Sequence, residues 1–388
     1  LTTSGTAIFL PFRACEVFQP QGVYYGLNAL SKNMIMADRK QLKNPNGVVL
    51  GTSGSGKSFS CKREATDVYI HTNDDLLFLD PEHEYISLCQ QLGGQIIQLS
   101  PDSGDYINPL DIDLKTNAGE NPLLIKADFI MSFCELILSA SQRGLKPIEK
   151  SVIDRCIPPI YRNYLKNPIA ENMPVLGDLY ECLRSQQVEQ AQELATALEL
   201  YVFGSLSYLN HQTNVNINNR VVCYDISALG QNLKKPGMLT VQNHIWQRTN
   251  LNRYAGKTTR IYLDEFHLLL KEPQTAAFTA SMYKRFRKYS GIPTALTQNV
   301  KDLLESPEIE NILENSDFIL MLNQAASDRN ILAQRLGISP EELKHITNSG
   351  VGEGLLFFGD KIIPFIDRFP TNTKLYQVMT TKPADLAV

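Results

Sequence analysis

The sequence lacks any apolar run long enough to cross a lipid bilayer. Roughly 18 consecutive apolar residues would be needed, and the best stretch, residues 123–140, is interrupted by Lys126, Asp128 and Glu135. This stretch therefore predicts an amphipathic helix, and we expect no membrane-spanning segment. No secretory signal peptide is recognisable. Because the chain starts at Leu1 and not at Met, we expect it to be a fragment whose N-terminal region is missing.

Disulfide and metal-binding patterns are also lacking. The seven cysteines are scattered without a C-x-x-C pair, and the six histidines form no H-E-x-x-H or similar spacing. Disulfides and zinc are poorly supported, so a reducing cytoplasm is the better prediction. An excess of positive charge is absent too, since the formal net charge is −4. A dedicated basic DNA-binding domain is therefore not expected, although local basic loops remain open.

What the sequence does contain is a phosphate-binding loop. Residues 51–58 read GTSGSGKS and match the pattern G-x-x-x-x-G-K-[ST] at every fixed position. An apolar, β-branched strand is predicted before the loop at 47–50, and a helix after it from Phe59 to about Ile70. This order places backbone N–H groups and a helix N-terminus against a triphosphate. The loop therefore predicts nucleotide binding.

The loop residues have distinct predicted roles. Lys57 would reach the β- and γ-phosphates, and the Ser58 hydroxyl would ligate Mg²⁺. We therefore predict ATP and Mg²⁺ as the ligands. The predicted nucleotide-binding residues are Gly51, Thr52, Ser53, Gly54, Ser55, Gly56, Lys57, Ser58 and Phe59.

A second signal is an apolar strand at 260–263 that ends in two carboxylates, Asp264 and Glu265. Asp264 would hold Mg²⁺ through water, and Glu265 would polarise the attacking water. A strand that ends in Asp-Glu is common by itself. Paired with the phosphate loop, it predicts that ATP is hydrolysed and not merely bound.

Three further residues are candidates for acting on the phosphates. Gln298 ends the next strand, which is expected between the two strands just described, and it would sense the γ-phosphate or the lytic water. The alternative is a solvated amide at the start of a loop. Arg287 is the first candidate, and Arg329 the second, for an arginine finger that reaches the phosphates of the next subunit. The alternative for each is a solvated charged face, which is the usual role of a charge run on a helix.

The segment Asp80-Pro81-Glu82-His83-Glu84-Tyr85 follows another predicted strand. Its three carboxylates suggest a functional edge of the sheet, because ligands bind at the carboxyl ends of strands in open α/β sheets. An acidic helix N-terminus is the alternative, and both interpretations stay open. His83, His267 and Trp246 have no surrounding constellation, so we predict structural roles for them.

The predicted elements indicate an α/β fold with a mostly parallel central sheet and an all-helical insertion. Hairpins are predicted over 23–38 and 354–365, and a further strand over 7–12. Strand patterns that fit a buried parallel sheet lie at 47–50, 76–79, 95–99, 221–226, 260–264, 293–297 and 317–322. We expect the first part of the nucleotide-binding domain at 1–115, the helical insertion at 116–212 and the second part at 213–388.

Two details are predicted within the insertion. Apolar residues between 188 and 202 recur at helical spacing, and Gly204 is a plausible cap for that helix. Pro158-Pro159 is predicted to kink or break another helix.

Taken together, these residues resemble the conjugation and type IV secretion ATPases of the TrbE/TraC/TraE group. These are VirB-type traffic ATPases within the larger clan of FtsK- and HerA-like pumps. The resemblance covers nearly the whole chain and rests on the motifs at 51–58, 80–85, 262–265, 287–298 and 352–355.

The resemblance implies a RecA-like P-loop domain with an all-helical subdomain. It also implies assembly into rings, expected to be hexamers, at the cytoplasmic mouth of an envelope-spanning channel. Its implied partners are copies of itself and other secretion-channel and coupling proteins. Membrane association would be peripheral, at the inner face of the cell membrane, through these partners or the missing N-terminal region.

Two functions stay open at this point. The first is an ATPase motor that powers secretion and pilus biogenesis. The second is a DNA-pumping translocase or conjugative coupling protein, for which contact with DNA is required. The net charge of −4 favours the first, because a surface that grips DNA is basic. Glu265 argues against a module that only binds nucleotide, since such a module needs no water-activating carboxylate.

Overall fold

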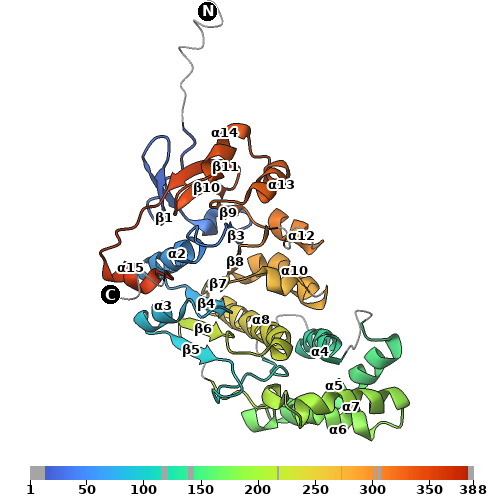
Figure 1. Ribbon diagram of the computed structural model, residues 1–388. Coiled ribbons are helices and arrows are strands. Elements are labelled where there is room, and N and C mark those ends of the chain that lie inside the picture. The colour runs from blue at the N-terminus through green and yellow to red at the C-terminus, as the bar shows by residue number, and fades with distance from the viewer. Residues whose placement is uncertain are drawn as a thin grey trace, which may run out of the picture.

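The structure is a computed structural model that describes residues 14–382 apart from 115–120, 139–143, 216–217, 272, 301–302 and 304–306. The strand predicted at 7–12 lies outside the described residues. One sheet runs through the molecule in the order β2-β1-β11-β10-β9-β3-β8-β7-β4-β6-β5 (Figure 1). The strands are β1 (Val23–Asn28), β2 (Met34–Ala37), β3 (Gly47–Leu50), β4 (Asp75–Asp80), β5 (Gln95–Gln98), β6 (Val221–Asp225), β7 (Thr259–Leu263), β8 (Gly291–Thr297), β9 (Phe318–Met321), β10 (Glu353–Phe358) and β11 (Lys361–Ile366).

Helices cover both faces of this sheet. In Figure 1, α2, α3 and α15 lie on one face, and α8, α10 and α12 lie on the other. The helices are α2 (Lys57–His71), α3 (Ile86–Gln91), α4 (Pro122–Leu138), α5 (Pro147–Lys166), α6 (Leu176–Ser185), α7 (Glu189–Val202), α8 (Gln231–Tyr254), α9 (His267–Leu270), α10 (Pro273–Phe286), α12 (Glu308–Glu314), α13 (Ala326–Leu336), α14 (Pro340–Leu343) and α15 (Lys374–Met379). Short 3₁₀ turns are η1 (Arg39–Gln41), η2 (Ala170–Asn172), η3 (Ser207–Leu209), η4 (Arg287–Tyr289) and η5 (Lys344–Ile346).

The strands from β9 through β5 in the sheet order are parallel, which confirms the predicted mostly parallel sheet. Their side chains alternate between two cores, as a period of two requires. In β4, Leu76 and Phe78 join the core beneath α2, whereas Leu77 and Leu79 join the core on the α8 face. Because both faces are covered, the central strands β3, β4, β7 and β8 are buried along their whole length.

The two ends of the described chain extend the sheet together. The hairpins β1–β2 and β10–β11 are both antiparallel, which confirms the two predicted hairpins. In addition, β1 pairs with β11, and β10 pairs antiparallel with β9. Two hairpins that are more than 300 positions apart thus continue the parallel sheet on the side of β9.

The elements described between β5 and β6 are all helical, from α4 to α7 and η3. Their core is continuous with that of the α8 face, since Phe133 and Leu198 belong to the same cluster of buried side chains as Leu239. α7 ends at Val202, two residues before Gly204. The domain boundaries at 115/116 and 212/213 stay a prediction.

Of the kink or break predicted at Pro158-Pro159, the break is wrong, because α5 continues through both prolines, and the kink stays a prediction. A proline removes the N–H that would donate to the carbonyl four residues earlier. Those carbonyls belong to Asp154 and Arg155, which are exposed, so water can satisfy them. The opposite side of α5, which includes Tyr161, is buried in the core and stabilises the helix.

Candidate active site

The phosphate-loop residues 51–58 connect the carboxyl end of β3 to the first turn of α2. Gly54 and Gly56 have φ of +74° and +102°, a region that residues with a Cβ rarely adopt. A Cβ on Gly51 would lie 2.4 Å from Ser55 Oγ, whose hydroxyl donates to Thr52 O at 2.7 Å. Glycines are therefore required for the tight curl of this loop.

Two distant segments hold the loop from outside. Thr52 N–H donates to Asn323 O at 2.9 Å, just after β9, and Gly352 N–H donates to Ser55 O at 3.2 Å, just before β10. The loop is therefore fixed by backbone contacts to the segments that follow β9 and precede β10.

The start of α2 offers a site for an anion. Its N-cap, Gly56, has no capping side chain, and the first N–H groups of a helix have no intrahelical acceptor. Lys57 is buried, and its Nζ donates across the loop to Thr52 O at 3.2 Å. Burial lowers the pKa of Lys57, while the Asp264 and Glu265 carboxylates act in the opposite direction. Ser58 follows in the first turn and is half-buried.

Phe59, the last predicted nucleotide-binding residue, uses its ring for packing. The ring centroid lies 5.6 Å from that of Phe369 and 5.5 Å from that of Tyr376. Arg63, one turn further along α2, forms an ion pair with Asp367. The C-terminal segment after β11 is thus attached to the phosphate-loop helix.

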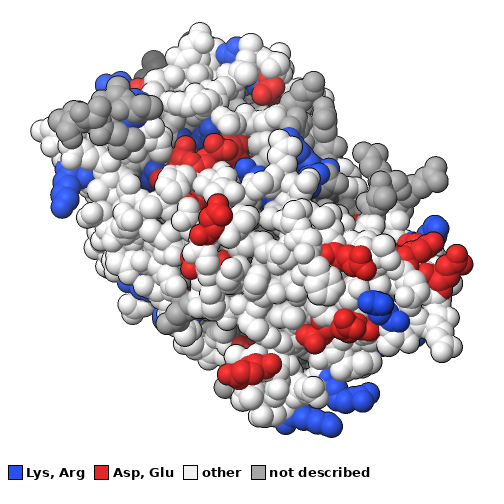
Figure 2. Space-filling model, turned by 60° about the horizontal axis from the view of Figure 1, so that its bottom comes forward, with Lys and Arg blue, Asp and Glu red and all other residues white. Residues whose placement is uncertain are grey.

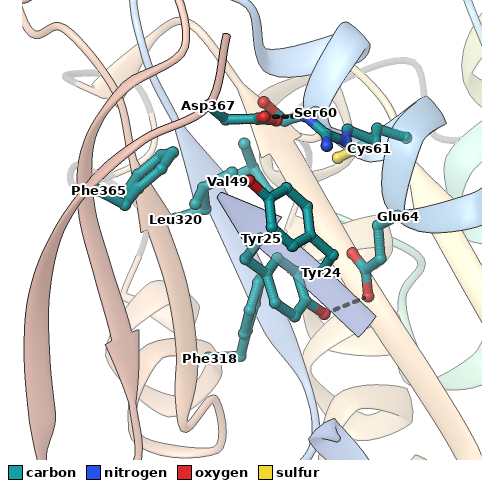
Figure 3. A pocket seen from close by; sticks show the side chains of 11 residues that line it. Tyr24, Tyr25, Val49, Ser60, Cys61, Glu64, Phe318, Leu320, Phe365 and Asp367 are labelled. Atoms are coloured by element: carbon teal, nitrogen blue, oxygen red, sulfur yellow. Dashed lines mark hydrogen bonds and ion pairs between the residues drawn. The ribbon is translucent and has the colours of Figure 1, made fainter. Parts of the chain in front are cut away.

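A small cleft lies beside α2 and is separate from the phosphate loop. Figure 3 shows Tyr24 and Tyr25 of β1 facing side chains of α2, and Tyr25 OH donates to Glu64 Oε1 at 3.1 Å. The cleft is lined by Tyr24, Tyr25, Val49, Ser60, Cys61, Arg63, Glu64, Phe318, Leu320, Phe365 and Asp367. No residue of the loop 51–58 is among them, so this cleft is not the predicted nucleotide site.

The sheet register brings the other predicted residues to the edge that bears the loop. Leu50 of β3 is paired with Thr297 of β8, and Leu263 of β7 is paired with Ala295 of β8. β8 therefore lies between the other two strands, as predicted. Gly51, Asp264 and Gln298, which follow these three strands, leave the sheet at the same edge.

Asp264 is a buried carboxylate with little internal compensation. It is 3% exposed, and the Glu265 N–H donates to its Oδ1 at 2.8 Å. Burial, together with the charges of the Glu84 and Glu265 carboxylates, raises the pKa of Asp264 to about 7. A cation beside Asp264 would offset this cost. The part of the chain that the structure describes has no group of three or more His, Cys, Asp or Glu side chains that could hold a metal. The pair of Ser58 and Asp264 fits Mg²⁺, which commonly takes one or two protein ligands together with phosphates and water.

Glu265 has one hydrogen-bonded carboxylate oxygen, Oε1, whereas its Oε2 is buried without a hydrogen-bond partner among the described residues. Its backbone has φ of +44°, an uncommon conformation for a non-glycine residue. Gln298 Nε2 donates to Glu265 Oε1 at 2.8 Å, and His267 Nδ1 lies 3.0 Å from Glu265 Oε2. The structural role predicted for His267 stays a prediction.

Within the segment 80–85, Asp80 and Glu84 support different interpretations, namely an acidic helix N-terminus and a functional edge of the sheet. The buried carboxylate of Asp80 accepts the N–H groups of Glu84 at 3.0 Å and Tyr85 at 2.8 Å, so it stabilises the turn into α3. Glu84 is different, because its Oε2 is buried and has no hydrogen-bond partner among the described residues. Its charge acts on Lys57 and Asp264. His83, with φ of +59°, has its Nδ1 2.7 Å from Asp225 Oδ2.

Comparison with protein families then decides the classification. The TraG P-loop domain family matches residues 30–349. The chain belongs to this family. The resemblance inferred from the motifs is thereby confirmed, and the chain is a P-loop NTPase of the TraG type.

Solved structures agree with this family. VirB4 of Thermoanaerobacter pseudethanolicus matches the TraG-family chain with a TM-score of 0.80 and 25% identity, over 92% of this chain and 98% of that chain. The bacterial conjugative coupling protein TrwB in complex with sulphate matches with a TM-score of 0.57 and 12% identity, over 97% and 95% of the two chains. The plasmid coupling protein TrwB in complex with ADP and Mg²⁺ gives 0.57 and 13% over the same shares. The RecA-like fold is confirmed. No curated protein that was compared matches the chain.

The two candidates for an arginine finger, Arg287 and Arg329, lie at opposite ends of the parallel strands. Arg287 Nη1 donates to Lys43 O at 3.4 Å and to Asn44 Oδ1 at 3.1 Å, just before β3 begins, so it lies away from the phosphate loop. Arg329 is in the first turn of α13, which follows the loop that contacts Thr52. The structure therefore brings Arg329, and not Arg287, to the edge where the phosphate loop lies.

Two remaining sequence expectations concern apolar features. Trp246 packs against Tyr289, with ring centroids 4.7 Å apart, which agrees with its predicted structural role. The stretch predicted as an amphipathic helix forms α4, where Lys126 is buried. None of the helices in the described ranges is long and apolar enough to span a membrane.

Proposed function

We propose that this chain is an ATP-hydrolysing motor that powers a type IV secretion or conjugation machine, in pilus biogenesis and substrate export. The observation that supports this most is the meeting of the loop 51–58, Asp264, Glu265 and Gln298 at one edge of the sheet. The similarity to VirB4 over 92% of the chain favours this kind of motor.

The chemistry assigns a role to each residue. The N–H groups of the loop and Lys57 would bind the β- and γ-phosphates, and Ser58 with Asp264 would hold Mg²⁺. Bound Mg²⁺ supplies neutralising charge to the phosphate oxygens. Glu265 would orient the attacking water as general base, and Gln298 would sense the γ-phosphate or that water.

The charge opposite the transition state would come from another copy of the chain. P-loop enzymes receive such an arginine in cis or in trans. We propose a ring, expected to be a hexamer, in which an arginine of one subunit completes the site of its neighbour. Other secretion-channel and coupling proteins would be its partners, and they would hold it in the cytoplasm against the inner face of the cell membrane.

A DNA-pumping translocase or coupling protein is the second candidate. The similarity to TrwB motivates it, but identities of 12% and 13% support only a common fold. On the face shown in Figure 2, acidic and basic side chains are interspersed, and no continuous basic strip crosses the described residues. Together with the net charge of −4, this favours the secretion motor, because gripping DNA requires neutralisation of many phosphates.

Phosphate release from ATP, with and without Mg²⁺, tests the proposal. The wild-type chain should hydrolyse ATP only with Mg²⁺, and Lys57→Ala should be inactive because the cation over the β- and γ-phosphates is lost. Lys40→Ala is the matched control, since Lys40 pairs with Asp74 at the other edge of the sheet. Absence of hydrolysis in the wild type, or turnover by Lys57→Ala, would contradict the proposal. Strong stimulation by duplex DNA would favour the second candidate.

A further inference from the structure

The Gly-Glu-Gly-Leu motif at 352–355 has no role in the function proposed above, yet the turn that begins it lies beside the phosphate loop. Gly352 N–H donates to Ser55 O at 3.2 Å. A Cβ on Gly56 would lie 3.4 Å from Val351 Cγ1 and 3.6 Å from Gly352 N. The turn before β10 therefore packs directly against the phosphate loop.

The two glycines of the motif allow this close approach. A Cβ on Gly352, which has φ of +75°, would collide with Asp367 O, and a Cβ on Gly354 would collide with Met321 O of β9. Asp367 N–H donates to Gly352 O at 2.8 Å, and the Asp367 carboxylate forms the ion pair with Arg63 of α2. The turn is thus fixed between β9, the segment after β11 and the phosphate loop.

The polar side chain of this turn is used within the turn itself. Glu353 Oε2 accepts the Gly350 N–H at 3.1 Å, and Glu353 Oε1 accepts from Arg368 Nη2 at 2.8 Å. Val351 differs from Glu353, because its side chain is 53% exposed. What the turn presents next to the phosphate loop is therefore an apolar side chain.

The order of the strands decides which end of a bound nucleotide faces Val351. β8 and β7 lie on one side of β3, and β9 and β10 lie on the other. The γ-phosphate has to face Asp264 and Glu265, which follow β7, if these residues act on Mg²⁺ and water. A nucleotide whose phosphates span the loop therefore directs its nucleoside toward β9 and β10, where Val351 lies.

We propose that Val351 is the contact for the nucleoside of the bound nucleotide: its exposed side chain packs against the base, and the turn 350–353 holds it there. This role rests on the proposed function and names the substrate class of the same site. An apolar side chain recognises shape and not the pattern of hydrogen-bonding groups. The site therefore binds purine nucleoside triphosphates with little discrimination between adenine and guanine.

Equilibrium binding of two ligands that share a triphosphate tests this role. One is the non-hydrolysable ATP analogue with an imido group between the β- and γ-phosphorus atoms, and the other is inorganic tripolyphosphate, which has no nucleoside. With Mg²⁺ present, Val351→Ser should weaken binding of the ATP analogue about tenfold, at the low end for an apolar group lost from a pocket. The affinity for tripolyphosphate should stay unchanged. The guanine counterpart of the analogue should respond as the adenine analogue does.

Two further variants complete the comparison. Val351→Ile keeps the apolar surface and should bind both ligands as the wild type does. Ile70→Ser is the matched control, because Ile70 is 67% exposed but lies in the last turn of α2, at the end away from the phosphate loop. It should leave both affinities unchanged. Thermal unfolding is measured for every variant to confirm folding.

Three results would overturn the role of Val351. One is unchanged affinity of Val351→Ser for the ATP analogue, and another is an equal loss of affinity for tripolyphosphate, which would mean that the phosphate loop itself is disturbed. The third is a loss confined to one of the two purines. Because binding is measured without turnover, a wild type that binds the analogue but does not hydrolyse ATP would refute the proposed motor and leave the nucleoside contact standing. A wild type that binds neither ligand would refute both.

Discussion

Buried charged side chains are paired differently at the two ends of the parallel strands, which we call the amino-terminal and the carboxyl-terminal edge of the sheet. At the amino-terminal edge, Arg39 Nη1 lies 2.9 Å from Glu64 Oε1, and Arg260 Nε lies 3.1 Å from Asp74 Oδ2. These four side chains are almost completely buried. Each charge has an opposite charge beside it, as buried ions require.

A second group at the same edge is centred on Asp75. Its Oδ2 lies 2.6 Å from Arg248 Nη2, and its Oδ1 lies 3.0 Å from Lys257 Nζ. Asn252 Nδ2 donates to the same carboxylate at 2.8 Å. The start of β4 is thereby attached to α8 and to the segment before β7. We interpret this edge as a structural clamp.

At the carboxyl-terminal edge, the carboxylates of Asp264, Asp80 and Glu84 form no ion pair with a side chain among the described residues. Asp264 accepts from the Glu265 N–H, Asp80 accepts from backbone N–H groups, and Glu84 Oε2 has no hydrogen-bond partner among the described residues. Burial raises the pKa of both Asp264 and Asp80. From this difference we infer that buried charges in ion pairs stabilise the fold. Buried carboxylates without an ion pair mark a region that binds a ligand.

The largest expected effect concerns the arginine that acts across a subunit interface. Arg329→Ala should lower ATP turnover about a thousandfold at concentrations where the chain assembles, because an arginine finger contributes that much. Arg287→Ala should have a small effect, since Arg287 is held by Lys43 and Asn44 at the amino-terminal edge. The measurement is phosphate release as a function of protein concentration.

Mixing inactive chains checks the same point. An Arg329→Ala chain with a Lys57→Ala chain should recover part of the activity, because one interface then combines an intact loop with an intact arginine. If Arg287→Ala is the inactive variant and is rescued by Lys57→Ala, the notion that the carboxyl-terminal edge supplies the finger is wrong.

The next effect concerns stability. Glu64→Gln should lower the free energy of unfolding by about 3 kcal/mol, because removing one partner of a buried ion pair leaves Arg39 without its carboxylate and Arg260 with Asp74 alone. Glu84→Gln is the matched control at the other edge and should leave stability unchanged or raise it. Urea unfolding of both variants measures this. Equal destabilisation by Glu64→Gln and Glu84→Gln would contradict the difference in charge pairing between the two edges.

Glu265→Gln should affect rate and not stability. It keeps the shape of the side chain and the proposed Mg²⁺ ligand Asp264, but it loses the charge that orients water. We expect ATP binding to persist while hydrolysis falls by a factor on the order of a hundred or more, as positioned general bases typically contribute. Nucleotide binding and single-turnover hydrolysis, measured on the same preparation, should separate. A parallel fall of both would make Glu265 a structural residue.

The smallest expected effect is a pH dependence of the free energy of unfolding, which arises from His244 and not from the charges at either edge of the sheet. His244 is buried beneath β6, and burial together with the Arg248 charge lowers its pKa to about 4. An unfolded histidine titrates near 6.5, so between about pH 6.5 and 4 the unfolded chain binds more protons. Stability should therefore be complete above pH 6.5 and fall by up to about 1.4 kcal/mol per pH unit below it.

His244→Asn should flatten this slope while keeping an acceptor for Tyr224 OH, which lies 3.0 Å from His244 Nδ1. Urea unfolding at several pH values between 7 and 5 provides the check. An unchanged slope in the variant would assign the loss to other groups.

Much of the fold and part of the site followed from the sequence because the signals are local. The apolar strands, the glycine loop and the carboxylates after β7 are short patterns with direct physical causes. The loop residues and Glu265 could therefore be placed without coordinates. The helix after the loop was also predicted, although it begins at Lys57 and not at Phe59.

The remaining features depend on contacts between distant segments. Arg287 and Arg329 look alike as basic residues, and only the sheet register assigns them to different edges. The hydrogen bond from Gln298 to Glu265 joins residues that follow two different strands, β8 and β7. Pro158 is tolerated because its side of α5 faces water, and a sequence pattern does not reveal which face of a helix is buried. The pairing of β1 with β11 likewise joins segments that share no local pattern.

The position of β3 in the sheet has a consequence for synthesis on the ribosome. Val48 of this strand is paired with Ala295 on one side and with Ile319 on the other. The emerging chain therefore contains the complete glycine loop long before it contains either neighbour of the strand that holds it. Since long-range strand pairing is slow and forms late, nucleotide affinity should be acquired abruptly near the end of translation. Ribosome-bound chains stalled before residue 291 should not retain ATP, whereas chains extended past the last hairpin should.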